Sequence, residues 1–154
     1  MDKQVYREIL NEIKNDYEIG NYDGVIRSAQ EIDVEKIRET AILEMIADSY
    51  DKLGRYDLAK ETLLYAYERT PFGRKMAYNL CLLCIKLDDL DNAVRFYQDF
   101  CKMAPRDSDR YILKYLIGKA GGVPVKELIK VLEQYVSENM DEKWQYELAR
   151  LYHE

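Results

Sequence analysis

The chain has 154 residues, of which 47% are hydrophobic and 34% are charged, a composition typical of one folded domain with a sizeable core. Its net charge of -6 and its lack of any basic run longer than two residues argue against nucleic acid as a partner and against a basic membrane-binding patch. No apolar run approaches the roughly 20 residues of a membrane span. The first residues also lack a signal-peptide pattern, so we expect a cytoplasmic protein without a membrane-inserted segment.

Seven glycines and three prolines punctuate the chain, and apolar residues recur between them with the spacing of amphipathic helices. This pattern predicts pairs of helices joined by short turns. The first helices of the pairs are expected near 3–18, 35–52, 74–86, 108–118 and 141–153. The second helices are expected near 22–31, 56–69, 90–103 and 125–138.

The chain is similar to itself at a shift of 34 residues, which places Gly20, Gly54, Asp88 and Gly122 at one position. That position predicts a turn with a left-handed backbone, which glycine adopts freely and aspartate tolerates. After Pro124 the second helix of the fourth pair arrives one residue late, which predicts a one-residue insertion in its turn. We expect a single domain with units near 6–39, 40–73, 74–107 and 108–141, followed by a final helix over 142–154.

The stretch from Ile42 to Pro71 resembles a tetratricopeptide repeat. The signature positions of that family are held here by Leu43, Ile46, Ala47, Tyr50, Gly54, Tyr56, Ala59, Ala66 and Pro71. The next unit keeps Leu80, Ala93, Tyr97 and Pro105 at corresponding sites, with Cys81 at the small-residue position of its first helix. The resemblance implies an all-α fold, a right-handed superhelical stack of antiparallel helix hairpins (an α-solenoid) with a concave inner face.

The resemblance also implies where a partner would bind, because first helices line the groove in this family. The corresponding positions here are Lys14, Tyr17, Glu44, Asp48, Asp51, Lys75, Tyr78, Asn79, Leu82, Ile112 and Lys119. Such a groove would be acidic in the middle and apolar toward the later units, so a protein or peptide with basic and apolar residues would complement it. The competing interpretation is that these charges only solvate the outer faces of helices.

No pattern of catalytic, cofactor or metal-binding residues is present in the sequence. His153 is the only histidine, and the pair Cys81 and Cys84 has no further ligands to complete a zinc site. The cysteines lie inside predicted helices, as buried structural thiols do. The pair Gly121 and Gly122 lies in a predicted helix–helix turn, not after a strand as in a phosphate-binding loop. We therefore predict a protein without enzyme activity, cofactor or metal.

Two other functions stay open beside a partner-binding scaffold. One is a self-association module, a homo-oligomer formed through the terminal helix, whose Trp144, Leu148, Leu151 and Tyr152 a missing second helix would leave partly bare. The other is the regulatory or targeting portion of a larger enzyme or membrane-attached protein. The last helix repeats the internal spacing of a first helix and stops just short of its turn, which favours a piece of a longer array over a lone capping helix.

Overall fold

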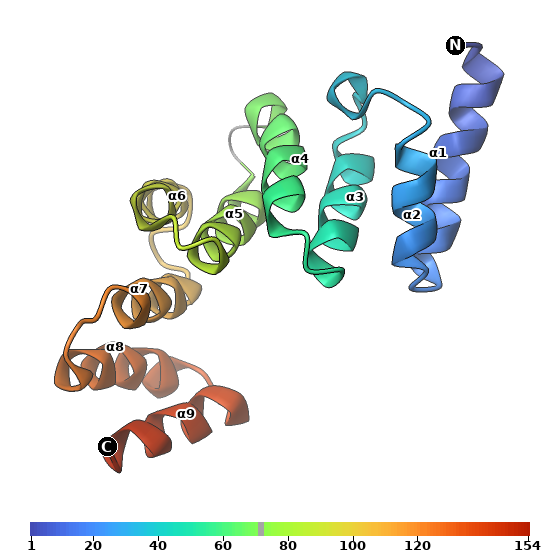
Figure 1. The fold of residues 1–154 in the computed structure, drawn as a ribbon. Helices are drawn as coiled ribbons and strands as arrows, with labels where there is room; N and C mark the ends of the chain where they lie inside the picture. The colour runs from blue at the N-terminus through green and yellow to red at the C-terminus, as the bar shows by residue number, and fades with distance from the viewer. Residues whose placement is uncertain (71–72) are drawn as a thin grey trace. The chain divides into compact units, whose positions relative to one another are not determined.

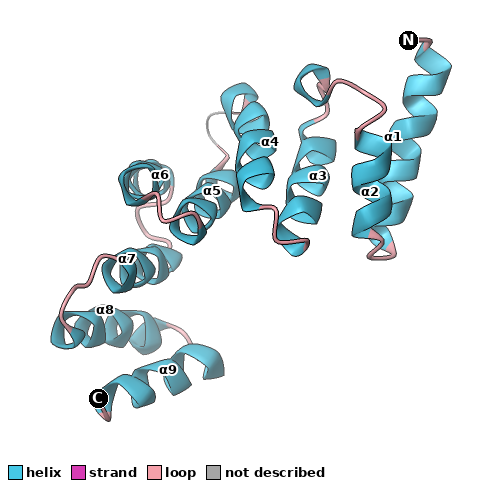
Figure 2. Cartoon of the chain, viewed as in Figure 1, coloured by secondary structure: helices cyan, strands magenta, loops and turns pink. Residues whose placement is uncertain are grey.

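The structure is a computed structural model that describes residues 1–70 and 73–154. These residues form nine α-helices and one 3-10 helix, and no strand occurs among them (Figure 2). The first helices are α1 (Lys3–Glu18), α3 (Thr40–Lys52), α5 (Arg74–Lys86), α7 (Asp109–Ala120) and α9 (Glu142–Tyr152). The second helices are α2 (Tyr22–Ala29), α4 (Tyr56–Arg69), α6 (Leu90–Met103) and α8 (Val125–Glu138).

The predicted helices agree with this order, except at the start of α3. The sequence predicts a helix from residue 35, but the structure has a short 3-10 helix, η1 (Val34–Lys36), and then extended backbone up to Thr40. The interruption places Ile37 in the core with no exposed surface. Burial of an isoleucine is worth about 1.5–3 kcal/mol and outweighs continuation of the helix. The predicted stop at Pro71 lies outside the described residues.

The turns inside the four hairpins are built in the same way, as the repeat predicts. Each turn contains one residue with positive φ, at +76°, +76°, +57° and +78° for Gly20, Gly54, Asp88 and Gly122. The next residue donates its N–H back to the carbonyl of the last turn of the first helix. These bonds are Asn21 to Asp16 at 2.8 Å, Arg55 to Tyr50 at 2.8 Å, Asp89 to Cys84 at 2.8 Å and Val123 to Gly118 at 2.9 Å. This Schellman geometry satisfies carbonyls at the helix end.

The fourth turn is one residue longer than the others, as its sequence predicts. Helices α2, α4 and α6 begin two residues after the positive-φ residue, whereas α8 begins three residues after Gly122. Pro124 precedes α8 with φ of -57°, and its carbonyl accepts from the N–H of Glu127 and Leu128 at 3.0 and 3.2 Å. The missing N–H of a proline costs nothing at this position, because no helical carbonyl would have accepted it.

The chain divides into two compact units, residues 1–76 and 77–154. In the first unit α1 packs on α2, α3 packs on α4, and α1 and α2 both contact α3 (Figure 1). Ala47 and Ala59 are small residues of these helices and are 3% and 0% exposed. Their small side chains let the packed helices approach closely. Larger residues at such positions would overpack the contact, at a cost of roughly 1–3 kcal/mol.

In the second unit the thiol of Cys81 on α5 is buried and donates to the carbonyl of Ala93 on α6 at 3.3 Å. Burial raises the pKa of Cys81 to about 12, so this thiol stays protonated and unreactive at neutral pH. Helices α7, α8 and α9 follow one another in order (Figure 1) and share one core. Its buried members are Ile112, Tyr115, Leu128, Leu132, Tyr135, Leu148 and Leu151.

Candidate partner-binding surfaces

The first unit brings three of the predicted site residues together. Tyr17 on α1 donates its hydroxyl to Asp48 Oδ2 on α3 at 2.7 Å, and Glu44 lies one helical turn before Asp48. The ring of Tyr17 meets Tyr22 edge-on, with 6.0 Å between the ring centroids. We call Tyr17, Glu44 and Asp48 the acidic surface.

The negative charges of the acidic surface are not paired with positive charges of the described residues. The hydrogen bond to Asp48, burial, and the negative charges of Asp48 and Glu44 together raise the pKa of Tyr17 to about 12. Both carboxylates are half-buried, and neither forms an ion pair with any cation in residues 1–70 or 73–154. Like charges one turn apart on a helix are destabilising by about 0.2–0.5 kcal/mol. The surface therefore holds negative charge that its own unit does not neutralise.

Three further predicted residues belong to the same unit. Lys14 is exposed on α1, Asp51 is half-buried near the end of α3, and Lys75 is exposed at the start of α5. Among the described residues, neither lysine forms a hydrogen bond or ion pair with the acidic surface. The positive charges that the sequence placed in the groove therefore do not offset the two carboxylates.

In the second unit Tyr78, Asn79 and Leu82 are half-buried on α5. The ring of Tyr78 packs at a tilt on Phe100 of α6, with centroids 5.7 Å apart. Burial, followed by the charge of Asp109, raises the pKa of Tyr78 to about 12, so its phenol is neutral. We call Tyr78, Asn79 and Leu82 the α5 surface, and it offers partly exposed apolar area beside one amide.

The prediction for Ile112 is wrong. This side chain is 2% exposed and belongs to the core of the second unit. In the 34-residue register it corresponds to Glu44 and Tyr78, which are half-buried. The apolar stripe of α7 instead includes Ile112 itself, together with Leu113 and Tyr115, and this turns Ile112 inward.

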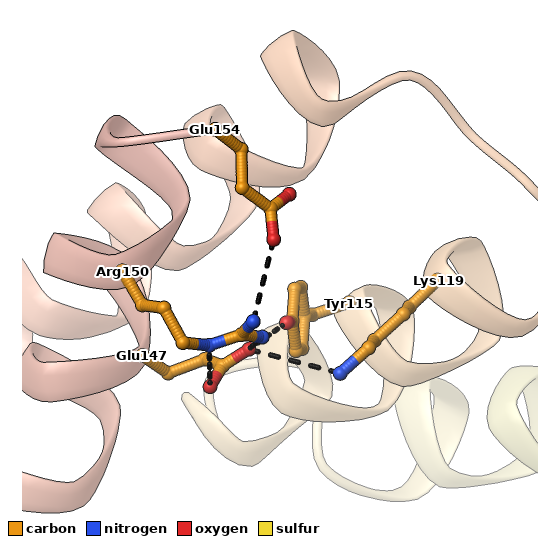
Figure 3. A network of polar contacts seen from close by, with 5 residues as sticks. All are labelled: Tyr115, Lys119, Glu147, Arg150 and Glu154. Atoms are coloured by element: carbon orange, nitrogen blue, oxygen red, sulfur yellow. Dashed lines mark hydrogen bonds and ion pairs between the residues drawn. The ribbon is translucent and has the colours of Figure 1, made fainter.

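Lys119 lies in a polar network that ties α7 to α9 (Figure 3). Its ammonium is 3.7 Å from Glu147 Oε1 and 5.9 Å from the ring of Tyr115. Tyr115 donates its hydroxyl to the same carboxylate at 2.7 Å. Arg150 donates to Glu147 Oε2 at 3.2 Å through Nε and to Glu154 at 3.3 Å through Nη1. Lys119 is therefore engaged within its own unit, in contrast to the carboxylates of the acidic surface.

The network strongly favours the ionised form of Glu147. Hydrogen bonds from Arg150 lower its pKa, burial opposes them, and the hydroxyl of Tyr115 and the charges of Arg150 and Lys119 complete a shift to about 2. Sequence reasoning did not find Glu147 or Tyr115. The available signal was Tyr115 itself, which lies 34 residues after Cys81 at a position that favours small side chains and yet is 1% exposed.

A shallow cavity near η1 is a second feature that sequence reasoning missed. Glu35, Lys36, Arg38 and Arg69 line it, and Arg69 donates to the carbonyl of Glu35. Lys36 pairs with Asp33 at 3.8 Å, and both side chains are largely exposed. Acidic and basic side chains therefore both line this cavity at the surface.

Across residues 1–70 and 73–154, no three histidine, cysteine, aspartate or glutamate side chains gather into a group that could hold a metal ion. None of the helices in this part of the chain has the length and hydrophobicity to cross a bilayer.

Residues 40–72 match the family model described as tetratricopeptide repeat. The match begins at the first residue of α3 and runs through α4, the hairpin whose signature residues the sequence predicts. The chain carries a tetratricopeptide repeat. No curated protein sequence matches the chain.

Solved structures share the fold of this chain over almost its whole length. A tetratricopeptide repeat protein from Parabacteroides merdae ATCC 43184 superposes with a TM-score of 0.84 at 18% identity, over 99% of this chain and 59% of its own. MamA from Desulfovibrio magneticus RS-1, in a form that begins at its residue 41, gives 0.75 at 17% identity, over 96% and 82%. MamA of strain MSR-1 gives 0.71 at 18% identity, over 98% and 86%.

These likenesses establish the fold. The chain is an all-α helical-repeat solenoid, which confirms the predicted fold class. Tetratricopeptide repeats act in general as scaffolds for protein–protein interaction. The chain spans 59% of the length of the Parabacteroides merdae protein, so repeats of this kind also occur in longer chains.

Proposed function

We propose that this tetratricopeptide chain is a scaffold that binds a peptide or helical segment of a partner protein through the faces of its first helices. The supporting observation is the acidic surface, where Glu44 and Asp48 are half-buried and lack an ion pair with any described residue. Half-buried charge without a counterion is costly unless something else supplies one. A lysine or arginine of the partner supplies it here.

The geometry of the acidic surface suits such a cation. Tyr17 donates to Asp48 Oδ2, which holds that carboxylate in place and leaves its other oxygen able to accept. Glu44 lies one turn earlier on the same helix. A guanidinium or ammonium group that reaches both carboxylates forms charge-assisted hydrogen bonds, each worth about 1.5–3 kcal/mol.

Within the second unit, the α5 surface is by itself suited to apolar residues of a partner. Tyr78 and Leu82 are only half-buried by their own unit, and the neutral phenol of Tyr78 presents a ring held firmly against Phe100. Aromatic side chains with few rotatable bonds lose little conformational entropy when a ligand covers them, which makes them good anchors for peptides.

The test is isothermal titration calorimetry with peptides that carry two arginines and two leucines at varied spacing. A Glu44→Gln, Asp48→Asn double variant removes the acidic surface, and a Glu18→Gln, Glu68→Gln double variant removes the same net charge from exposed positions elsewhere. We expect the first variant to weaken binding about tenfold or more, since each 1.4 kcal/mol is a factor of ten. We expect the control variant to bind within about twofold of the parent chain.

Binding should also weaken as salt is raised, because the recognised charges are partly exposed and salt screens them. Equal losses of affinity in the two double variants would show that only net charge matters. The acidic surface would then not be the binding site.

A further inference from the structure

The cavity beside η1 is lined mainly by basic side chains, although the chain as a whole is acidic. Three of the four described residues that line it are the cations Lys36, Arg38 and Arg69, and the fourth is Glu35. Three positive charges and one negative charge give this lining a net charge of +2, in a chain whose net charge is -6. The cavity volume of about 570 Å³ lies within the range of small-ligand sites.

The linker between α2 and α3 brings Lys36 and Arg38 to the same side of the chain. Asp33 caps η1 by accepting from the N–H of Glu35 at 3.2 Å, and the backbone is extended at Ile37. Ile37 lies between the two cations and is 0% exposed. Neighbouring side chains in extended backbone point to opposite faces, so the burial of Ile37 turns Lys36 and Arg38 toward solvent. Both of them are exposed.

The third cation comes from a helix that is distant in the sequence. Arg69 is the last residue of α4, and α4 contacts η1 within the first unit (Figure 1). Its guanidinium donates through Nη2 to the carbonyl of Glu35, which holds the end of this side chain beside η1. A guanidinium has five N–H donors in a fixed planar fork. Arg69 is therefore held in place and keeps further donors for a ligand.

The cations of the cavity are only weakly paired with the rest of the described chain. Lys36 lies 3.8 Å from Asp33, and the two side chains are 83% and 56% exposed, so this ion pair contributes little to stability. Arg38 forms no hydrogen bond or ion pair with any described residue. The other carboxylate nearby, Glu39, accepts the hydroxyl of Tyr6 at 3.3 Å. An anion that enters the cavity therefore displaces no strong contact of the fold.

The two guanidinium groups act on the same region. Burial and the carboxylate of Glu39 raise the pKa of Tyr6, whereas the positive charges of Arg38 and Arg69 both lower it. The hydroxyl of Tyr6 therefore lies within electrostatic reach of both arginines. Arginines that converge from separate elements suit a phosphate group, because each guanidinium can donate two parallel N–H bonds to its oxygens.

The charge of the lining distinguishes between anions. A phosphate monoester carries about -1.5 to -2 at pH 7, which matches the net charge of the lining, whereas a carboxylate carries only one negative charge. We propose that the cavity beside η1 binds a phosphate group, either inorganic phosphate or a phosphomonoester, through Arg38 and Arg69, with Lys36 beside them. The carboxylate of Glu35 accepts from a donor next to the phosphate oxygens, such as the P–O–H of hydrogen phosphate or a peptide N–H.

This phosphate site is independent of the acidic surface, although both belong to the first unit. The acidic surface takes a cation and the cavity takes an anion, so one ligand group does not compete for both. The Glu44→Gln, Asp48→Asn double variant should therefore lose the cationic peptide and bind phosphate within about twofold of the parent chain. Failure of either interaction leaves the other measurable.

The experiment is an NMR titration of the ¹⁵N-labelled 154-residue chain with inorganic phosphate, at neutral pH and constant ionic strength, observed at the arginine Nε–H groups and the backbone amides. Arg38→Gln removes a cation that has no hydrogen bond or ion pair among the described residues, so the fold should be unchanged. Arg27→Gln removes the same charge from an exposed position on α2 and is the matched control. We expect saturable shifts, a dissociation constant at least fivefold higher in Arg38→Gln, and one within twofold of the parent in Arg27→Gln.

Two further ligands define the chemistry that the cavity recognises. Acetate supplies a carboxylate, and it should bind at least fivefold more weakly than phosphate. A peptide with one phosphoserine supplies the phosphate from a protein segment. Tighter binding of this peptide than of inorganic phosphate would identify a protein as the source, equal or weaker binding would identify free phosphate, and both results support the site. Shifts that never saturate, equal affinities in Arg38→Gln and Arg27→Gln, or acetate binding as tight as that of phosphate would overturn the proposal.

Discussion

In each unit a hydrogen bond from a tyrosine to a carboxylate joins two successive first helices, at different positions of the repeat, and the two units balance the charge of that carboxylate differently. In the first unit Tyr17 of α1 donates to Asp48 of α3 at 2.7 Å, and in the second Tyr115 of α7 donates to Glu147 of α9 at 2.7 Å. Glu147 also forms ion pairs with Lys119 and Arg150 of its own unit. The carboxylates of the acidic surface form no ion pair with a lysine or arginine among the described residues. The charge of Glu147 is therefore paired within its own unit, whereas Glu44 and Asp48 form no ion pair with any described residue.

The largest expected effect on stability comes from removing the side chain of Tyr115, which donates to Glu147. Tyr115 is 1% exposed and is the largest fully buried side chain among the described residues, so Tyr115→Ala leaves a cavity and frees Glu147. We expect the free energy of unfolding to fall by about 3–5 kcal/mol, as for other buried aromatic truncations. Urea denaturation followed by circular dichroism measures it. Tyr146→Ala is the control, since that ring is 73% exposed, and it should change stability by less than about 0.5 kcal/mol.

The ion pairs of Glu147 predict the next effect, which depends on pH. The pKa of Glu147 in the folded chain is about 2, below the ordinary glutamate value of 4.5, so its contribution to stability is present above pH 4.5 and is lost as the pH falls from 4.5 toward 2. Because the network is partly exposed, we expect Glu147→Gln to lower stability by roughly 1–2 kcal/mol at pH 7. The difference between the parent and the variant should shrink on acidification. A difference that stays constant between pH 7 and pH 2.5 would show that the charge of Glu147 is not what stabilises α9.

The turns offer a smaller comparison between the units. Asp88 adopts φ of +57°, where Gly54 at the matching turn of the first unit adopts +76°. A left-handed backbone costs a residue with a Cβ about 1 kcal/mol, so Asp88→Gly should raise stability by about 0.5–1 kcal/mol and Gly54→Asp should lower it by a similar amount. Thermal unfolding of the two single variants and the double swap measures both signs. Changes of the same sign would contradict this explanation of the turns.

The sequence predicts the parts of this fold that local geometry determines. The four left-handed turn residues follow from a 34-residue period, because glycine and aspartate tolerate that backbone wherever they lie. The extra residue before α8 follows from the late arrival of Leu128 and Leu132. The start of α3 does not follow, because the burial of Ile37 depends on the helices around it.

The candidate site is predicted less well, for a similar reason. Tyr17, Glu44 and Asp48 do converge, since equivalent positions of α1 and α3 face one way when the repeats are regular. Ile112 is buried and Lys119 pairs with Glu147, because α7 departs from the pattern of the earlier first helices. A large tyrosine occupies its small-residue position and reaches a carboxylate 32 residues later in the chain. A contact of that kind leaves no local periodic signal.

The most direct test compares the stability and the peptide affinity of one variant, Glu44→Gln. If the acidic surface exists to bind a cation, removing one of its two like charges should leave the free energy of unfolding unchanged or raise it by a few tenths of a kcal/mol. The same change should weaken binding of an arginine-containing peptide about tenfold. A loss of stability of 1 kcal/mol or more, with peptide affinity unchanged, would mean that Glu44 serves the fold and not a partner.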